Sequence, residues 1–378
     1  MRMVVKPRMY NVPMRVIAVI AMVACVGLAQ QRRVTDAEVR EVHKSALLID
    51  SHNDATSRTV TGVDIGLRAT KGHTDVPRLR EGGVGAVFFA AYVAPTYAKD
   101  HTAANRAMQM IDTVRHDIVA RHTNDFALAL TADDVVAAHK AGKIAALIGV
   151  EGGHAIEDSP RLLRDFYALG VRYLTLTHTN TNGWADSSGD LREKAVQRHN
   201  GLNDLGKQIV QEMNHLGMIV DISHVADKTF WDALEISKAP IFASHSSCRA
   251  LCDVPRNMTD EMIAALGKKG GVIQINFNCG FLTKRAADEK SGIRASLADV
   301  VAHIDHAVKI AGVDAVGIGS DFDGITCTPE GLDDVSKFPN LTRALLEKGY
   351  SAADIRKIYG GNTLRLLREV ERHKLSGE

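Results

Sequence analysis

Short apolar runs alternate with longer amphipathic segments along the chain from Val34 onward. The apolar runs consist mainly of Val, Ile, Leu and Ala with few polar residues between them, which is typical of parallel strands buried on both faces. Eight runs are predicted strands, covering 46–50, 84–92, 144–150, 171–177, 218–222, 240–243, 271–276 and 315–319. The segments between them are long enough for helices, so the pattern predicts a parallel sheet wrapped by helices.

Residues that begin and end helices support this reading. Ser159 followed by Pro160 predicts a helix start, and Thr131 with Asp134 resembles a capping box. Glycines precede five of the strand runs, where tight turns from helix to strand need them, at positions 83, 142, 170, 217 and 270. Two further helices are expected over 337–348 and 351–373. With no internal repeat or linker, one (β/α)8 TIM barrel over residues 34–378 is the expected domain.

Polar residues gather where these predicted strands end. The first strand runs into Asp50-Ser51-His52-Asn53-Asp54, and five others end at Glu151, His178, His224, His245 and Asp321 to Asp323. In a barrel of this kind the carboxyl ends of the strands meet at one face, where the active site lies. The sequence therefore predicts a site built from His, Asp and Glu at that face.

Five of these residues form a candidate metal site. His52 and Asp54 are two positions apart, so on an extended strand their side chains share one face. Glu151 could bridge two ions through its two oxygens, and His224 and His245 come from adjacent strands. The composition, with 16 His and 5 Cys, favours imidazole and carboxylate ligands over thiolates. The set predicts two Zn²⁺ ions with an open position for water, ligated by His52, Asp54, Glu151, His224 and His245.

Each ligand also has a structural alternative. A single histidine at a strand end is more often hydrogen-bonded than metal-bound, Asp54 could cap a loop, and Glu151 could pair with a surface arginine. The metal interpretation is preferred because all five would have to reach the same face of the barrel by coincidence.

The N-terminal segment reads as a separate unit. Four basic residues between Arg2 and Arg15 precede an apolar run, Val16 to Ala29, that is short for a membrane span. We interpret residues 1–29 as a secretory signal peptide, which predicts a secreted or periplasmic protein. Lipid anchoring to a membrane through Cys25 is the alternative. The formal net charge of +1 on 378 residues, without a long basic block, argues against a nucleic-acid partner.

Four cysteines follow this segment, and an oxidising compartment would permit a disulfide. A Cys252–Cys279 bridge is the first choice from the sequence. Buried free thiols are the alternative.

The stretch from Val150 to His178 resembles the signature of the membrane dipeptidase (renal dipeptidase) family, peptidase family M19. It contains Glu151-Gly152-Gly153 and ends in Gly170-Val171-Arg172-Tyr173-Leu174-Thr175-Leu176-Thr177-His178. Further matches are Ile49 to Asp54, Asp221 to His224, Ser244 to Ser247, Arg256-Asn257 and Gly319 to Gly324. The resemblance covers about residues 40 to 370 and implies a metal-dependent amidohydrolase-type barrel.

The resemblance implies the same five zinc ligands, with Glu151 bridging. It also implies that His178 lies beside the scissile carbonyl, that Arg256 holds the substrate carboxylate, and that Asp321 binds the free amine and transfers protons. Asp323 is the competing acid for that last role. A homodimer is implied as well.

The expected function is zinc-dependent hydrolysis of dipeptides by a metal-bridging hydroxide. Some members of the family also accept L-D dipeptides or penem-type β-lactams, so the resemblance implies these as possible further substrates. The alternatives are another amidohydrolase-type reaction, such as N-acyl amino acid deacylation or lactone hydrolysis, and a non-catalytic extracellular zinc-binding protein.

Overall fold

The structure is a computed structural model that describes residues 1, 3–6, 33–286 and 292–374. The chain divides into two compact units, Met1–Arg32 and Arg33–Glu378, and the assigned helices and strands lie in the second. Most of the predicted signal peptide, including Cys25, falls outside the described residues. Among the residues that are described, no helix has both the length and the apolar character required to cross a membrane.

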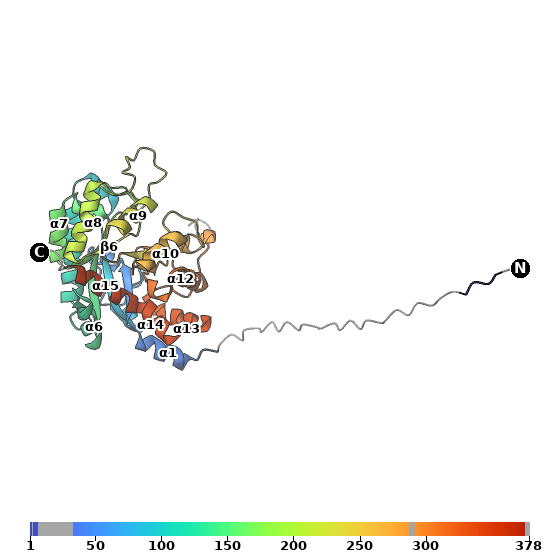
Figure 1. The fold of residues 1–378 in the computed structure, drawn as a ribbon. Coiled ribbons are helices and arrows are strands. Elements are labelled where there is room, and N and C mark those ends of the chain that lie inside the picture. Colours follow the sequence, from blue (N-terminus) through green and yellow to red (C-terminus); the bar gives the residue numbers. More distant parts are fainter. Residues whose placement is uncertain (2, 7–32, 287–291, 375–378) are drawn as a thin grey trace. The chain divides into compact units, whose positions relative to one another are not determined.

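Eight parallel strands form the centre of the second unit, and helices surround them (Figure 1). Along the sheet the strands follow the order β1-β2-β4-β5-β6-β7-β8-β9. Their bounds are β1 Leu48–Asn53, β2 Val84–Tyr92, β4 Ile144–Glu151, β5 Val171–Thr175, β6 Ile219–Asp221, β7 Phe242–Ser246, β8 Val272–Ile275 and β9 Val316–Ile318. The predicted (β/α)8 barrel is thereby confirmed.

The first and last strands meet at their carboxyl ends. The backbone N–H of Asp54 donates to the carbonyl of Phe322 at 2.8 Å, and the N–H of Asp321 donates to the carbonyl of His52 at 3.0 Å. An additional strand, β3 (Phe126–Leu128), pairs with β4 and was not predicted. Three residues are too few to show a clear period, which explains why this strand was missed.

Side chains fill the barrel below its carboxyl face. The rings of Phe88, Tyr173 and Phe242 come from β2, β5 and β7, and their centroids lie 5.3 to 6.5 Å apart. Because these strands are not neighbours in the sheet, the rings can meet only inside the barrel. Gly149 on β4 leaves space for Tyr173, since a Cβ at that position would lie 1.9 Å from the Tyr173 Cζ.

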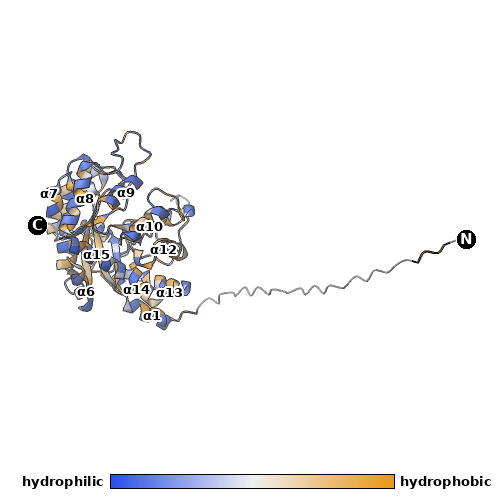
Figure 2. Cartoon of the chain, in the orientation of Figure 1, coloured by the Kyte–Doolittle hydropathy of each residue, from blue (hydrophilic) through white to orange (hydrophobic). Residues whose placement is uncertain are grey.

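Helices cover the outside of the barrel, and they carry both hydrophilic and hydrophobic residues (Figure 2). Their bounds are α1 Asp36–Ser45, α2 Ala55–Thr59, α3 Val76–Glu81, α4 Pro95–Lys99, α5 Ala103–Asp112, α6 Ala132–Lys140, α7 Pro160–Ala168, α8 Asp204–Leu216, α9 Asp227–Ile236, α10 Asp260–Lys268, α11 Cys279–Leu282, α12 Leu297–Ala311, α13 Phe338–Lys348, α14 Ala352–Arg356 and α15 Asn362–His373. π-Helical segments follow α5 and α14, at Thr113–Ala120 and Lys357–Gly361.

The predicted helix and turn signals have the expected local geometry. Ser159 caps α7, whose first residue is Pro160, and the capping box of Thr131 and Asp134 opens α6. The five glycines before strands all have positive φ angles, between 63° and 108°. That conformation strains residues with a Cβ, which explains glycine at these turns.

Candidate metal centre

The predicted ligands reach one place at the carboxyl face of the barrel. His52, Glu151 and His245 lie on β1, β4 and β7, while Asp54 and His224 lie just beyond β1 and β6. Three groups of these residues and their neighbours have potential ligand atoms within 4.8 Å of one another: His52, Glu151 and His245; Glu151, His178 and His224; and His52, Asp54 and Asp321. All five predicted ligands therefore belong to one overlapping cluster.

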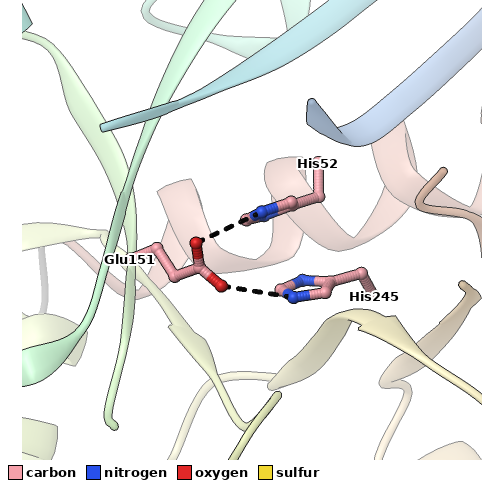
Figure 3. A group of neighbouring side chains, drawn as sticks. All are labelled: His52, Glu151 and His245. Carbon is pink, nitrogen blue, oxygen red and sulfur yellow. Dashed lines mark ion pairs between the residues drawn. The ribbon is translucent and has the colours of Figure 1, made fainter. Parts of the chain in front are cut away.

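Glu151 is at the centre of this cluster. Figure 3 shows the His52 and His245 rings directed at its carboxylate, one toward each oxygen. The Nε2 of His52 lies 3.5 Å from Oε2, whereas those of His245 and His224 lie 3.3 and 3.0 Å from Oε1. The two oxygens of one carboxylate thus face different histidines.

The donor atoms suit divalent cations. The Nε2 of His52 is buried and has no hydrogen-bond partner in the described part of the chain, although Asp54 Oδ2 is 3.2 Å away. The Nε2 atoms of His224 and His245 are 3.0 Å apart and share Glu151 Oε1. Lone pairs of imidazole and carboxylate that face one another at these distances are stabilised by a cation between them, and this mixed set suits Zn²⁺.

Burial changes the acidity of the carboxyl groups. It raises the pKa of Asp321 to about 7 and that of Asp54 to about 6, with His52 opposing the rise in both. Burial also raises the pKa of Glu151, but the histidines around it have the larger combined effect and hold that pKa well below its usual value. Burial places the pKa values of His224 and His245 well below their usual value, so both rings are neutral, as metal ligands must be.

Asp321 and Asp323 occupy different environments. Asp323 accepts hydrogen bonds from the Arg58 guanidinium at 3.1 Å and from the backbone of His73 at 2.7 Å, one on each oxygen. Asp321 accepts one from the Asn276 amide at 2.8 Å through Oδ2. Both acids line a cavity of about 400 Å³ in front of Glu151, but both oxygens of Asp323 already have partners.

His224 and Asp321 have left-handed backbone conformations, with φ angles of 68° and 63°. Such conformations cost about 1–3 kcal/mol for residues with a Cβ. Hydrogen bonds hold both segments, from Ser188 N to the carbonyl of His224 and from Asp321 N to that of His52. The strand-end pattern of the sequence gives no sign of this turn.

His178 and Arg256 are the other two predicted substrate contacts, and of these His178 lines the cavity whereas Arg256 does not. His178 lines the cavity, with its Nε2 3.9 Å from Glu151 Oε1 and its ring centroid 4.8 Å from that of Tyr92. Arg256 is not among the described residues that line the cavity. Its guanidinium donates to Ser246 Oγ and the carbonyl of His245, and its Cζ lies 5.6 Å from the ring of Phe281, which does line it.

Other residues also line the cavity, and Tyr92 among them was not predicted. Tyr92, the last residue of β2, and Asn278 and Phe281, beyond β8, line it. Burial raises the pKa of Tyr92 to about 12, so its hydroxyl remains protonated. Tyr92 closes a predicted strand, which is the one signal that could have identified it.

The predicted Cys252–Cys279 bridge is wrong, because Cys279 pairs with Cys327. Cys248 and Cys252 are free and buried. The Cys252 thiol lies 3.3 Å from the carbonyl of Gly280. Cys327 forms the disulfide with Cys279 because it follows β9, which is the neighbour of β8. The backbone N–H of Cys279 also donates to the carbonyl of Cys327.

Known proteins resemble this chain over nearly its whole second unit. Residues 36–377 match the sequence model of the membrane dipeptidase family, peptidase family M19. An uncharacterized dipeptidase of Schizosaccharomyces pombe is 36% identical over 364 residues, which is 92% of this chain and 86% of the relative. Mouse dipeptidase 3 is 37% identical, over 86% of this chain and 64% of the longer relative.

A solved structure agrees with these sequence relatives. A metallopeptidase of Rhodobacter sphaeroides, liganded with a phosphinate mimic of the dipeptide L-Ala-D-Ala, superimposes with a TM-score of 0.75 and 28% identity. The match covers 86% of this chain and 99% of that structure. With its own barrel and cluster of potential metal ligands, this chain belongs to the membrane dipeptidase family, peptidase family M19, and is a metallopeptidase of the dipeptidase type.

Proposed function

We propose that the protein hydrolyses dipeptides with two Zn²⁺ ions bridged by Glu151. The observation that carries this proposal is the division of the Glu151 carboxylate, with Oε2 toward His52 and Oε1 toward His224 and His245. His52 and Asp54 would complete one ion, and His224 and His245 the other. When bound, the ions would lower the pKa of a shared water to about 7 and polarise the substrate carbonyl.

The protein's own residues would orient the dipeptide and move the proton. Among the described residues, the Asp321 carboxylate accepts a hydrogen bond from Asn276 alone, through Oδ2, so Oδ1 is available to take a proton and return it to the leaving nitrogen. His178 would donate to the carbonyl oxygen from its position in the cavity wall. Arg256 would grip the terminal carboxylate with two parallel bonds. Its bonds to Ser246 and His245 use two of its five N–H groups, and its buried Nε has no hydrogen-bond partner among the described residues.

The substrate class follows from this arrangement. A cavity of about 400 Å³ falls in the range of small-ligand sites, and a carboxylate clamp close to the metals would exclude longer peptides. We include L-D dipeptides, because the Rhodobacter sphaeroides metallopeptidase is liganded with a mimic of one. Penem-type β-lactams also contain an amide bond, which their four-membered ring strains, and they belong in the same screen.

A metal assay with a substrate panel tests the proposal. Purified protein should contain two zinc equivalents per chain, lose activity on prolonged chelation and regain it with Zn²⁺. The panel should include L-L and L-D dipeptides, a tripeptide, an N-acyl amino acid and a lactone. Preference for the last two would support the deacylase or lactonase alternative, and zinc without any hydrolysis would support a non-catalytic protein.

We also propose that residues 1–29 direct secretion and are removed, and that the mature protein is a homodimer. The apolar run Val16 to Ala29 supports the first point, with lipid anchoring at Cys25 as the alternative. Mass spectrometry of the exported protein would separate cleavage after residue 29 from a lipidated Cys25. Sedimentation of that protein would give its mass in solution, and a monomer would refute the dimer.

A further inference from the structure

Two buried aspartates at the carboxyl face hold a neighbouring strand end in the same way. The Asp221 carboxylate accepts the backbone N–H of Ser244 at 2.8 Å and its hydroxyl at 2.6 Å. The Asp50 carboxylate accepts the same two bonds from Ser320, also at 2.8 and 2.6 Å. All four residues are completely buried. We call these pairs the Asp221 clasp (Asp221 and Ser244) and the Asp50 clasp (Asp50 and Ser320).

The likeness extends to the remaining bonds. Each carboxylate also accepts the backbone N–H of the residue two positions further along and a bond from a third side chain: Ser223 and Thr175 for Asp221, and His52 and Asn53 for Asp50. The distances are 3.0 and 2.6 Å in the first case and 3.5 and 3.2 Å in the second. Four hydrogen bonds thus satisfy each buried carboxylate.

The residue that follows each serine belongs to the candidate site. His245 follows Ser244, and Asp321 follows Ser320. The difference between the clasps that bears on the site is the partner of the serine oxygen. Ser244 Oγ lies 2.7 Å from Nδ1 of His245, whereas Ser320 Oγ accepts the backbone N–H of Phe322 at 3.1 Å.

This difference fixes the protonation of the His245 ring. A carboxylate can only accept hydrogen bonds, so the Ser244 hydroxyl proton points to Asp221. The other acceptor near it, Ser223 Oγ, is farther away at 3.3 Å. Ser244 Oγ must then accept from His245, which places the ring proton on Nδ1. The lone pair is left on Nε2, the atom that faces Glu151 at 3.3 Å.

We propose that Asp221 and Ser244 are positioning residues that set the tautomer of His245 for metal binding, a role that the Asp50 clasp does not have. The inference rests on the proposed two-zinc function, because it assigns an outer partner to one of the proposed ligands. Partners of this kind fix the ring and raise its affinity for the metal, and removing them typically weakens binding about 10–100-fold.

The variant D221N reverses the direction of the hydrogen bonds that run from His245 through Ser244 to residue 221, and it creates no cavity. Its amide oxygen can still accept from the backbone of Ser223 and Ser244, but its nitrogen donates to Ser244 Oγ. The hydroxyl proton then turns toward Nδ1 of His245, and the ring proton moves to Nε2, where it blocks the metal. D50N is the nearest control, because the same reversal at Ser320 reaches no imidazole, although D50N would also lose the bond that Asp50 Oδ2 accepts from the Asn53 amide.

The readout is Zn²⁺ affinity, from competition with a chromophoric chelator, together with the absorption spectrum of the Co²⁺ form. We expect D221N and S244A to bind one of the two zinc equivalents about 10–100-fold more weakly than wild type, with an altered Co²⁺ spectrum. D50N and S320A should retain wild-type affinity for both, and S244T, which keeps the hydroxyl, should restore it. Thermal unfolding of each variant checks that the barrel is intact.

Two results would overturn the inference. Wild-type affinity in D221N and S244A would exclude a role in metal binding. An equal loss in both clasps would show that they act only on barrel structure. If S244A does not fold, the isosteric pair D221N and D50N decides the matter alone. Failure of wild-type protein to bind two zinc equivalents would instead reject the proposed function, and the inference with it.

Discussion

Replacing Asp321 with asparagine separates proton transfer from metal binding. Asn276 donates to Oδ2 of Asp321 at 2.8 Å, and an asparagine oxygen at that position would keep the bond. The amide nitrogen would then replace Oδ1, which removes the proton acceptor and leaves the volume unchanged. General acid–base catalysis contributes about 10²–10⁴ to a rate, or about 3–5 kcal/mol of transition-state stabilisation.

We therefore expect kcat of D321N to fall by about 10²–10⁴ while the protein still binds two zinc equivalents. Steady-state kinetics on the preferred dipeptide and metal analysis of the same sample provide the measurement. D323N is the matched control, since both oxygens of Asp323 already bond to Arg58 and His73. It should retain kcat within about tenfold and lose about 1–3 kcal/mol of stability instead. A fully metallated D321N with near-normal kcat would refute the assignment of the proton carrier.

Three further predictions concern binding and stability. R256A should raise KM about 10–100-fold for dipeptides with a free carboxylate and leave KM for C-terminally amidated dipeptides unchanged; equal effects on both would reject the clamp. The double variant C279A/C327A should lose about 4 kcal/mol of unfolding free energy, because the bond joins positions separated by 48 residues, and denaturant titration showing no loss would contradict this. Burial lowers the pKa of His303, so the unfolded chain binds a proton that the folded chain does not, and the free energy of unfolding should fall as pH drops below about 6.5. In H303Q this fall should be shallower, and an unchanged slope would exclude His303 as a contributor.

The sequence predicted the barrel because its strands carry a strong signal. Long apolar runs such as 84–92 and 144–150 read as buried parallel strands without help from tertiary structure. The polar residues at their ends could be assigned to one face, because topology alone brings the carboxyl ends of parallel strands together.

Details that depend on side-chain direction could not be predicted in this way. The sequence shows that Asp321 and Asp323 both follow a strand. Only the structure shows that Arg58 and His73 donate hydrogen bonds to the two carboxylate oxygens of Asp323. The partner of Cys279 depends on which loop lies beside β8, a property of strand order rather than of cysteine spacing.

The Asp221 clasp is a further case of this kind. Asp221 and Ser244 stand on neighbouring strands, and their identities are ordinary for buried strand ends. Nothing in the local sequence indicates that Ser244 contacts the ring of His245. That relation becomes visible only when the direction of each hydrogen bond is followed from the carboxylate outward.

The contact between the first and last strands has a consequence for how the enzyme matures. His52 and Asp54 lie at the start of the barrel and Asp321 at its end, and the backbone bonds from Asp321 to His52 and from Asp54 to Phe322 join them. A nascent chain still attached to the ribosome has its early ligands exposed long before β9 has been synthesised. We therefore expect a metal ion to bind at full affinity only after β9 has been synthesised and the barrel has closed.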